Sequence, residues 1–126
     1  MLFKIETKEK FKVISIISPE LSAALTDELS RTIQSVLEEE PKNIVLNLSE
    51  LTVIDPPAMH WLVQMHQNFY ENKASFVICG LSKPLQKQLD EAELLEMLNH
   101  TPTESEAYDI VQMEEIEREL MGDDEE

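Results

Sequence analysis

Residues 43–70, NIVLNLSELTVIDPPAMHWLVQMHQNFY, hold the pattern that decides the fold. The apolar run at residues 44–46 leads through a short polar connection to Val-Ile-Asp at residues 53–55, two prolines and a periodic helical segment. A strand that is apolar on both sides of the pleat is typical of a parallel sheet with helices on both faces. The stretch therefore predicts a strand, a loop and a helix. Binding sites in such sheets gather where loops leave the carboxyl ends of strands.

Two strands and a helix are predicted before this stretch. Residues 2–6 alternate and residues 11–17 are rich in β-branched side chains, so we expect a hairpin. Residues 18–20 are expected to end the second strand and open a helix, which Pro41 ends. The face of this helix that should lie on the sheet is marked, at a spacing of four, by Leu21, Leu25, Leu29, Ile33 and Leu37.

The helix after the central strand is expected to begin with Pro57 in its first turn, where no intrahelical donor is needed. Pro56 imposes an extended conformation on Asp55, whose side chain is interpreted as a helix cap, a cation ligand or a partner contact. His60 falls on the polar face and is expected at the surface. The opposite face of this helix contains Ala58, Leu62, Met65 and Phe69.

One more buried strand is predicted at residues 74–79, followed by a turn in which Gly80 has a positive φ. Ser82 is expected to cap the next helix. Residues 94–98 either continue that helix or form a short helical turn, and residues 99–102 leave room for a short edge strand.

The last helix is predicted to start at Thr103, because a hydroxyl followed three residues later by Glu106 is a capping box. It should run towards Leu120. The side chains that it should bury are Ala107, Ile110 and Val111.

This order of elements predicts an α/β domain with a small mixed, mostly parallel sheet of four to five strands and about four helices packed on it. The chain length suits one domain, which we place at residues 1–121. Residues 122–126 are acidic and are expected to form a disordered tail.

The net charge of −16 argues against binding to nucleic acid, because affinity for phosphate backbones comes from clustered Lys and Arg. No apolar run approaches the roughly 18 residues that a membrane span needs, and the first residues do not resemble a signal peptide. We therefore expect a cytoplasmic protein without direct membrane insertion. Its single cysteine, Cys79, excludes an internal disulfide and a cysteine-rich metal site.

Four residues are candidates for catalysis or metal binding: Asp55, His60, His66 and Cys79. A cysteine that ends an apolar strand is usually a small core residue. The two histidines are six residues apart and so form no helical metal pair of the i, i+4 type. We expect no enzymatic activity, no catalytic residue, no cofactor and no metal.

An apolar strand, Asn-Leu-Ser at residues 47–49, and Val-Ile-Asp at residues 53–55 before a helix resemble the STAS domain, the fold of anti-sigma-factor antagonists. The resemblance covers roughly residues 2–113. In that family an Asp-Ser-Ser-Gly or Asp-Ser-Thr-Gly turn follows, and its first hydroxyl accepts a phosphate from a partner kinase. Here the turn is Asp-Pro-Pro-Ala at residues 55–58, so the position equivalent to the phospho-acceptor is Pro56, which cannot be phosphorylated. The family's Gly-x-Leu-Asp junction is here Pro-Glu-Leu-Ser at residues 19–22.

The resemblance implies a non-enzymatic interaction module that acts by partner binding without serine phosphorylation at the usual turn. The implied partners are a kinase-like anti-sigma factor or other STAS-like proteins. These can include further copies of this chain, which would then form a homo-oligomer. Two other classes stay open. One is an accessory subunit of a membrane transporter of the ABC type, and the other is a small-ligand or nucleotide sensor that uses the edge of the sheet at Asp55.

The partner surface is expected at the carboxyl edge of the sheet, where the loops of parallel strands meet and where the resemblance places the family's switch. Met59 and His60 are expected to be exposed there. Ser49 and Thr52 are close enough to the turn to accept a phosphate instead. The predicted partner-binding residues are Pro19, Glu20, Leu21, Ser22, Asp55, Pro56, Pro57, Met59 and His60.

Overall fold

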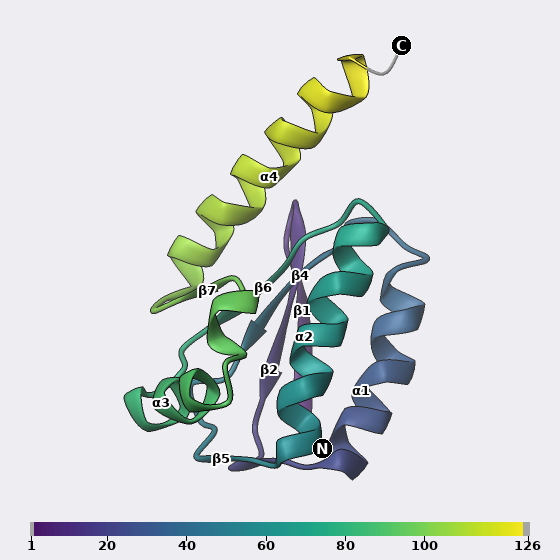
Figure 1. Cartoon of the computed structure of the whole chain (residues 1–126). Coiled ribbons are helices and arrows are strands. Elements are labelled where there is room, and N and C mark those ends of the chain that lie inside the picture. The colour runs from purple at the N-terminus through teal and green to yellow at the C-terminus, as the bar shows by residue number, and fades with distance from the viewer. Residues whose placement is uncertain (1, 125–126) are drawn as a thin grey trace.

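A computed structural model describes residues 2–124, the last four by their backbone alone, and shows a central sheet between two layers of helices (Figure 1). The strands of this sheet, in spatial order, are β1 (Phe3–Thr7), β2 (Phe11–Ile16), β4 (Asn43–Asn47), β6 (Phe76–Cys79) and β7 (His100–Thr101). Only β1 and β2 are antiparallel, and the other neighbours run parallel. The predicted hairpin and the mixed, mostly parallel sheet are therefore confirmed.

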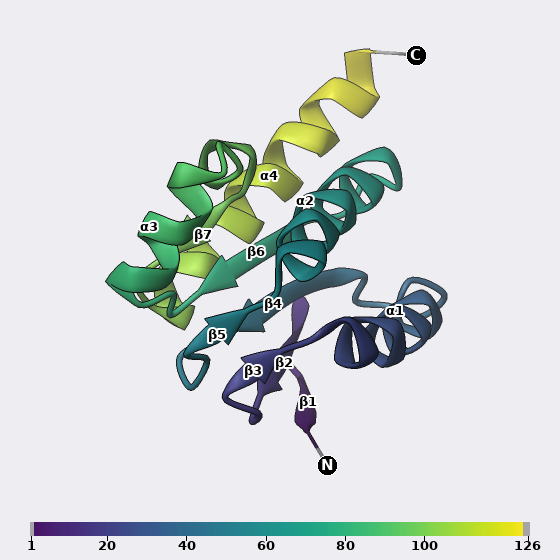
Figure 2. The same ribbon diagram turned by 60° about the horizontal axis from the view of Figure 1, so that its bottom comes forward.

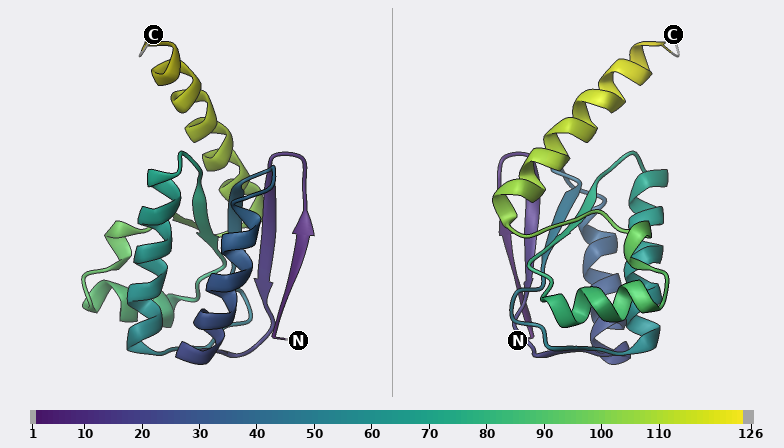
Figure 3. Two further views of the ribbon diagram at one scale, coloured as in Figure 1. Left: turned by 90° about the vertical axis from the view of Figure 1, so that its right-hand side faces the viewer. Right: turned by 60° about the vertical axis from the view of Figure 1, so that its left-hand side comes forward.

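The helices divide between the two faces of the sheet (Figure 3). α1 (Ala23–Val36), α2 (Pro56–Glu71) and α3 (Lys83–Glu91) cover one face, and α4 (Glu104–Asp124) covers the other. Residues 94–98 do not continue α3, because Glu93 adopts a φ of 61° and interrupts the helix. A separate 3-10 turn, η1 (Leu95–Met97), follows instead.

A second, two-stranded ladder lies beyond the carboxyl ends of β2 and β4. It pairs β3 (Glu20–Leu21) with β5 (Val53–Ile54) in parallel. The expectation that residues 18–20 open the first helix is therefore wrong. α1 begins only at Ala23, after the hydroxyl of Ser22 accepts a hydrogen bond from the N–H of Leu25 at 3.3 Å.

The core has two parts, because side chains alternate between the faces of the sheet. In β4, Ile44 and Leu46 point into the larger cluster beneath α1, α2 and α3. Val45 points the other way, into a smaller cluster that includes Ala107 and Val111 of α4. Since β4 and β6 are covered on both faces, they are apolar throughout their centres, as the sequence predicted.

α2 lies on the sheet with the face that the sequence predicted. Ala58, Leu62 and Phe69 are fully buried, Met65 is half-buried and His60 is exposed. A side-chain hydrogen bond joins α2 to α1: the indole Nε1 of Trp61 donates to Ser30 Oγ at 2.7 Å.

α4 starts as predicted, with the hydroxyl of Thr103 accepting a hydrogen bond from the N–H of Glu106 at 3.2 Å. It is longer than predicted. The helix continues past Leu120 to Asp124, three residues into the segment expected to be a disordered tail, and its last turns project beyond the sheet (Figures 1 and 3). The remainder of that predicted tail, residues 125–126, lies outside the described residues. No helix in the described part of the chain is long and apolar enough to cross a membrane.

Candidate partner-binding surface

The turn from β5 into α2 carries an acidic side chain that the fold itself does not use. Asp55 occupies the N-cap position with an extended backbone, φ −70° and ψ 147°, as the following proline requires. Its carboxylate makes no capping hydrogen bond. A cap side chain normally accepts from the second or third residue of the helix; here the second is Pro57, which has no N–H, and the N–H of Ala58 at the third position makes no hydrogen bond to the side chain of Asp55. Asp55 therefore keeps its carboxylate free for another contact.

The β3–β5 ladder holds this turn against the chain segment that precedes α1. The N–H of Asp55 donates to the carbonyl of Leu21 at 3.2 Å. The carbonyl of Pro19 accepts three hydrogen bonds, from the N–H of Thr52 at 2.8 Å, the N–H of Val53 at 3.1 Å and the hydroxyl of Thr52 at 3.1 Å. Two segments more than thirty residues apart thus lie side by side, as β3 and β5 do in Figure 2.

Most of the predicted contact residues do lie on this surface. Pro19, Glu20, Pro56, Pro57 and His60 are exposed, and Ser22 and Asp55 are half-buried. We call these seven residues the turn surface.

Two of the predicted contact residues are not accessible. Leu21 has an exposed fraction of 0%, because strand alternation in β3 turns it inward while Glu20 points outward. Met59 has an exposed fraction of 7%, so its expected exposure is wrong. It lies three residues before Leu62 and shares the inner side of α2 with it.

Val53 was missed by the sequence reasoning. This large apolar side chain is 48% exposed and is paired with Glu20 across the ladder. The alternation of an exposed Val53 with a buried Ile54 was the signal available, but two residues are too few to show a period on their own.

The chemistry of the turn surface favours contact with protein over capture of an anion. It contains the carboxylates of Glu20 and Asp55 and no Lys or Arg. The N-terminus of a helix binds phosphate through its free N–H groups. The first two residues of α2 are prolines, so two of those donors do not exist.

Cys79 is a core residue, as predicted. It is 1% exposed and lies in the cluster beneath α4 with Val77 and Val111. Burial, together with the negative charge of Glu104, raises the pKa of its thiol to about 11. The thiol is therefore protonated at neutral pH and is a poor nucleophile.

The other chemical candidates do not gather into a site. Among the residues that the structure describes, no three His, Cys, Asp or Glu side chains come together in a way that could hold a metal ion. A hollow of about 490 Å³ lies between α1 and α2 and is lined by Ile33, Met65 and Phe69 among others. These residues belong to the C-terminal halves of the two helices, away from Asp55 at the start of α2.

A comparison with known protein families matches residues 3–107 to the STAS domain. The chain belongs to the STAS domain family. The fold agrees, since the STAS domain here superimposes on an anti-sigma factor antagonist from Mycobacterium paratuberculosis with a TM-score of 0.73 at 17% identity, over 87% of this chain and 92% of that one. A second similar structure is a putative anti-sigma factor antagonist from Thermotoga maritima, with a TM-score of 0.68 at 18% identity, over 87% and 94% of the two chains.

The same fold also occurs inside a membrane transporter. The murine anion transporter Solute Carrier 26 family member A9 matches with a TM-score of 0.65 at 12% identity, over 86% of this chain but only 18% of the transporter. No curated protein matches the sequence. At these identities the structures establish the STAS fold, and the choice of partner has to be argued from the surface itself.

The two hydroxyl groups near the turn of this STAS domain differ in their surroundings. The hydroxyl of Thr52 donates a hydrogen bond to the carbonyl of Pro19. Ser49 is exposed and its N–H is held by Asn47 Oδ1 at 2.9 Å. The equivalence of Pro56 to the phospho-acceptor of the family stays a prediction, as does the absence of a substitute acceptor.

Proposed function

We propose that this STAS domain is a non-enzymatic interaction module that binds a protein partner through the turn surface. The observation that carries the proposal is the free carboxylate of Asp55, fixed at the start of α2 with no role in capping the helix. Buried or structural carboxylates are normally paired, whereas this one makes no capping hydrogen bond and belongs to a half-buried residue fixed by the hydrogen bond from its N–H to the carbonyl of Leu21. In this proposal the carboxylate serves to recognise the partner.

The turn surface is suited to binding at low entropic cost. Pro56 and Pro57 have a fixed φ and lose little conformational freedom when a partner orders them. Val53, which lies beside the turn surface as the ladder partner of Glu20, adds exposed apolar area that supplies affinity. Glu20 and Asp55 supply negative charge, which selects a partner with Lys or Arg at the matching positions.

The partner implied by the family is a kinase-like anti-sigma factor or another STAS-like protein, in the cytoplasm. An accessory subunit of an ABC-type membrane transporter is the second candidate, and the murine anion transporter is an example of a domain of this fold in a transporter of another kind. Affinity purification of the full chain separates the two, because the first predicts a kinase-like or sigma-regulating protein and the second predicts a transporter ATPase. Sedimentation of the purified chain tests whether it forms a homo-oligomer.

Replacing Asp55 with Arg and His60 with Glu together is expected to weaken partner binding by more than tenfold, or about 1.4 kcal/mol. Both side chains lie outside the core, so the fold should be kept. The measurement is titration calorimetry with the co-purified partner. The matched control is Glu71→Arg with Gln67→Glu, which makes the same kinds of charge change on exposed positions at the other end of α2. Equal affinity in both variants would place the interface elsewhere.

We expect no phosphorylation of the turn. A phosphate would add a charge of about −1.5 to −2 beside Asp55, and Pro56 has no oxygen to accept it. The test is intact-mass measurement after incubation with the co-purified kinase and ATP, with Ser49→Ala as the control for the accessible hydroxyl. A stoichiometric mass gain on Ser49 or Thr52 that also abolishes partner binding would contradict a module without a switch.

A further inference from the structure

The outer face of α4 carries three large apolar side chains that the domain leaves uncovered. Met113, Ile116 and Leu120 have exposed fractions of 59%, 57% and 62%. They are three and four residues apart, so they form one stripe along the helix. The opposite face of α4 is the buried one, with Ala107 and Val111 against the sheet. Single exposed apolar residues are ordinary, whereas contiguous exposed apolar surface is a feature of interaction sites.

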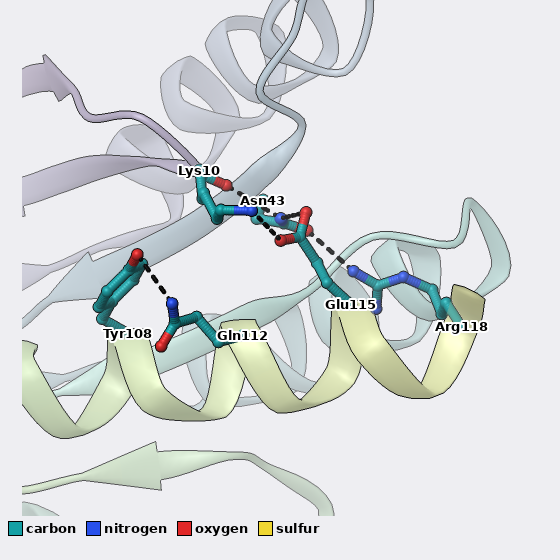
Figure 4. Close-up of polar contacts among 6 residues, drawn as sticks. All are labelled: Lys10, Asn43, Tyr108, Gln112, Glu115 and Arg118. Atoms are coloured by element: carbon teal, nitrogen blue, oxygen red, sulfur yellow. Dashed lines mark hydrogen bonds and ion pairs between the residues drawn. The ribbon is translucent and has the colours of Figure 1, made fainter. Parts of the chain in front are cut away.

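Polar contacts fix the direction in which this stripe points (Figure 4). Glu115 accepts a hydrogen bond from Asn43 Nδ2 at 3.0 Å and lies 3.9 Å from Lys10 Nζ. The guanidinium of Arg118 donates to Ser75 Oγ at 3.1 Å and to Asn43 Oδ1 at 3.3 Å. Glu115 and Arg118 therefore hold their side of α4 against the sheet. The stripe on the other side of the helix is directed outward.

The stripe has the spacing of a coiled-coil seam. If Met113 and Leu120 are a positions, Ile116 is the d position between them, and the flanking e and g positions are Glu117 and Glu119. Both glutamates are exposed. The preceding a and d positions are Glu106 and Asp109, so the apolar seam is confined to the second half of α4, which contacts the edge of the sheet through Glu115 and Arg118 and then continues past it in Figure 1. We call residues 113–120 the α4 seam.

Charge decides which kind of helix fits the α4 seam. α4 contains nine acidic residues and one basic residue, a net charge of −8. The one basic residue is Arg118, whose guanidinium is hydrogen-bonded to Ser75 and Asn43 on the side of α4 that faces the sheet. A second copy of α4 would place Glu against Glu at the flanking positions, and like charges there disfavour pairing. A partner with Lys or Arg at those positions would be attracted.

We propose that the α4 seam binds a helix of another protein, one with apolar residues at its own a and d positions and Lys or Arg at e and g. This site is separate from the turn surface. The turn surface lies where the chain enters α1 and α2, while the end of α4 projects from the opposite end of the molecule (Figure 1). The two surfaces can therefore be occupied at the same time, and a failure of one leaves the other untouched.

The test uses the full chain and a labelled helical peptide of three heptads with Leu at a and d and Lys at e and g, followed by fluorescence anisotropy. A second peptide differs only in having Glu in place of every Lys. The Lys peptide should bind at least tenfold more tightly than the Glu peptide. Changing Glu117 and Glu119 to Lys together should reverse this preference, because the flanking charges are then inverted.

The seam itself is tested by the triple variant Met113→Ser, Ile116→Ser and Leu120→Ser, which should bind the Lys peptide at least tenfold more weakly than the wild-type chain. The matched control makes the same change at three exposed apolar residues elsewhere, Leu2, Tyr70 and Met97, and should bind as the wild type does. Both variants keep the net charge, so non-specific attraction of a basic peptide is common to them.

Three results would overturn the proposal. The Lys peptide could bind the wild type and the seam variant equally, or the Glu peptide could bind as well as the Lys peptide. The third is sedimentation showing a wild-type dimer that the seam variant dissociates, since the occupant would then be a second copy of this chain. Circular dichroism melts confirm that each variant is folded, which is expected because the substituted side chains are exposed.

Discussion

Replacing Asn43 with Ala is expected to lower the free energy of unfolding by about 3 kcal/mol. Asn43 has an exposed fraction of 4% and sits at the start of β4. Its amide nitrogen donates to the carbonyl of Lys10 and to Glu115 Oε2, both at 3.0 Å. Its amide oxygen accepts from the N–H of Ser75 at 2.8 Å and from Arg118 at 3.3 Å. One side chain therefore joins the start of β2, the approach to β6 and the second half of α4.

The loss of unfolding free energy at Asn43 is large because the groups that it hydrogen-bonds remain in the structure without a partner. Alanine would leave the N–H of Ser75 buried without an acceptor, and an unsatisfied buried donor costs more than a hydrogen bond contributes. The measurement is urea denaturation followed by circular dichroism. Asn47→Ala is the control at the other end of the same strand, where the side chain accepts one hydrogen bond from the exposed Ser49, and it should cost about 1 kcal/mol. Equal losses in the two variants would contradict the joining role of Asn43.

Replacing Gly80 with Ala is also expected to lower the free energy of unfolding, by about 3 kcal/mol. Gly80 has a φ of 82°, which strains any residue with a Cβ. A Cβ there would lie 3.0 Å from both Cβ and N of Ser49 and 3.1 Å from its Cα. Because two of these are backbone atoms, the clash cannot be relieved by turning a side chain. The loop after β4 would have to move.

Gly122→Ala is the matched control for Gly80, since these are the two glycines of the chain. Gly122 lies within α4, where alanine is favoured over glycine by up to about 1 kcal/mol. Denaturation should therefore show a strong loss at Gly80 and no loss at Gly122. A similar small effect at both positions would mean that the loop at Ser49 adjusts easily.

Much of the fold was predictable because its signals are local. The apolar runs of β4 and β6, the hydroxyl caps and the positive φ of Gly80 each depend on a few neighbouring residues. The β3–β5 ladder was not predictable in this way. Each of its strands has two residues, and their pairing joins positions more than thirty residues apart, so no period in the sequence announces it. α1 begins only at Ala23 because residues 20–21 form β3 of that ladder.

The candidate surfaces were predictable in part, for the same reason. The position of Asp55 and the two prolines at the carboxyl edge followed from the strand–loop–helix order. The burial of Met59 did not, because it depends on the side of α2 that meets the core. The outward stripe of α4 was hidden too. The spacing of Met113, Ile116 and Leu120 was visible, but only the packing of α4 on the sheet shows which face is left open.

The way α4 is anchored has a consequence for how it moves. Its first half rests on the sheet through Ala107 and Val111, and Glu115 and Arg118 add the last contacts before the helix projects alone. We expect backbone amides near Val111 to exchange with solvent only when the whole domain unfolds, and those near Leu120 to exchange through local fraying of the helix. Protection against hydrogen exchange is therefore expected to fall along this helix from Val111 towards Leu120. Residues 113–120 span the stretch over which this fall in protection is expected.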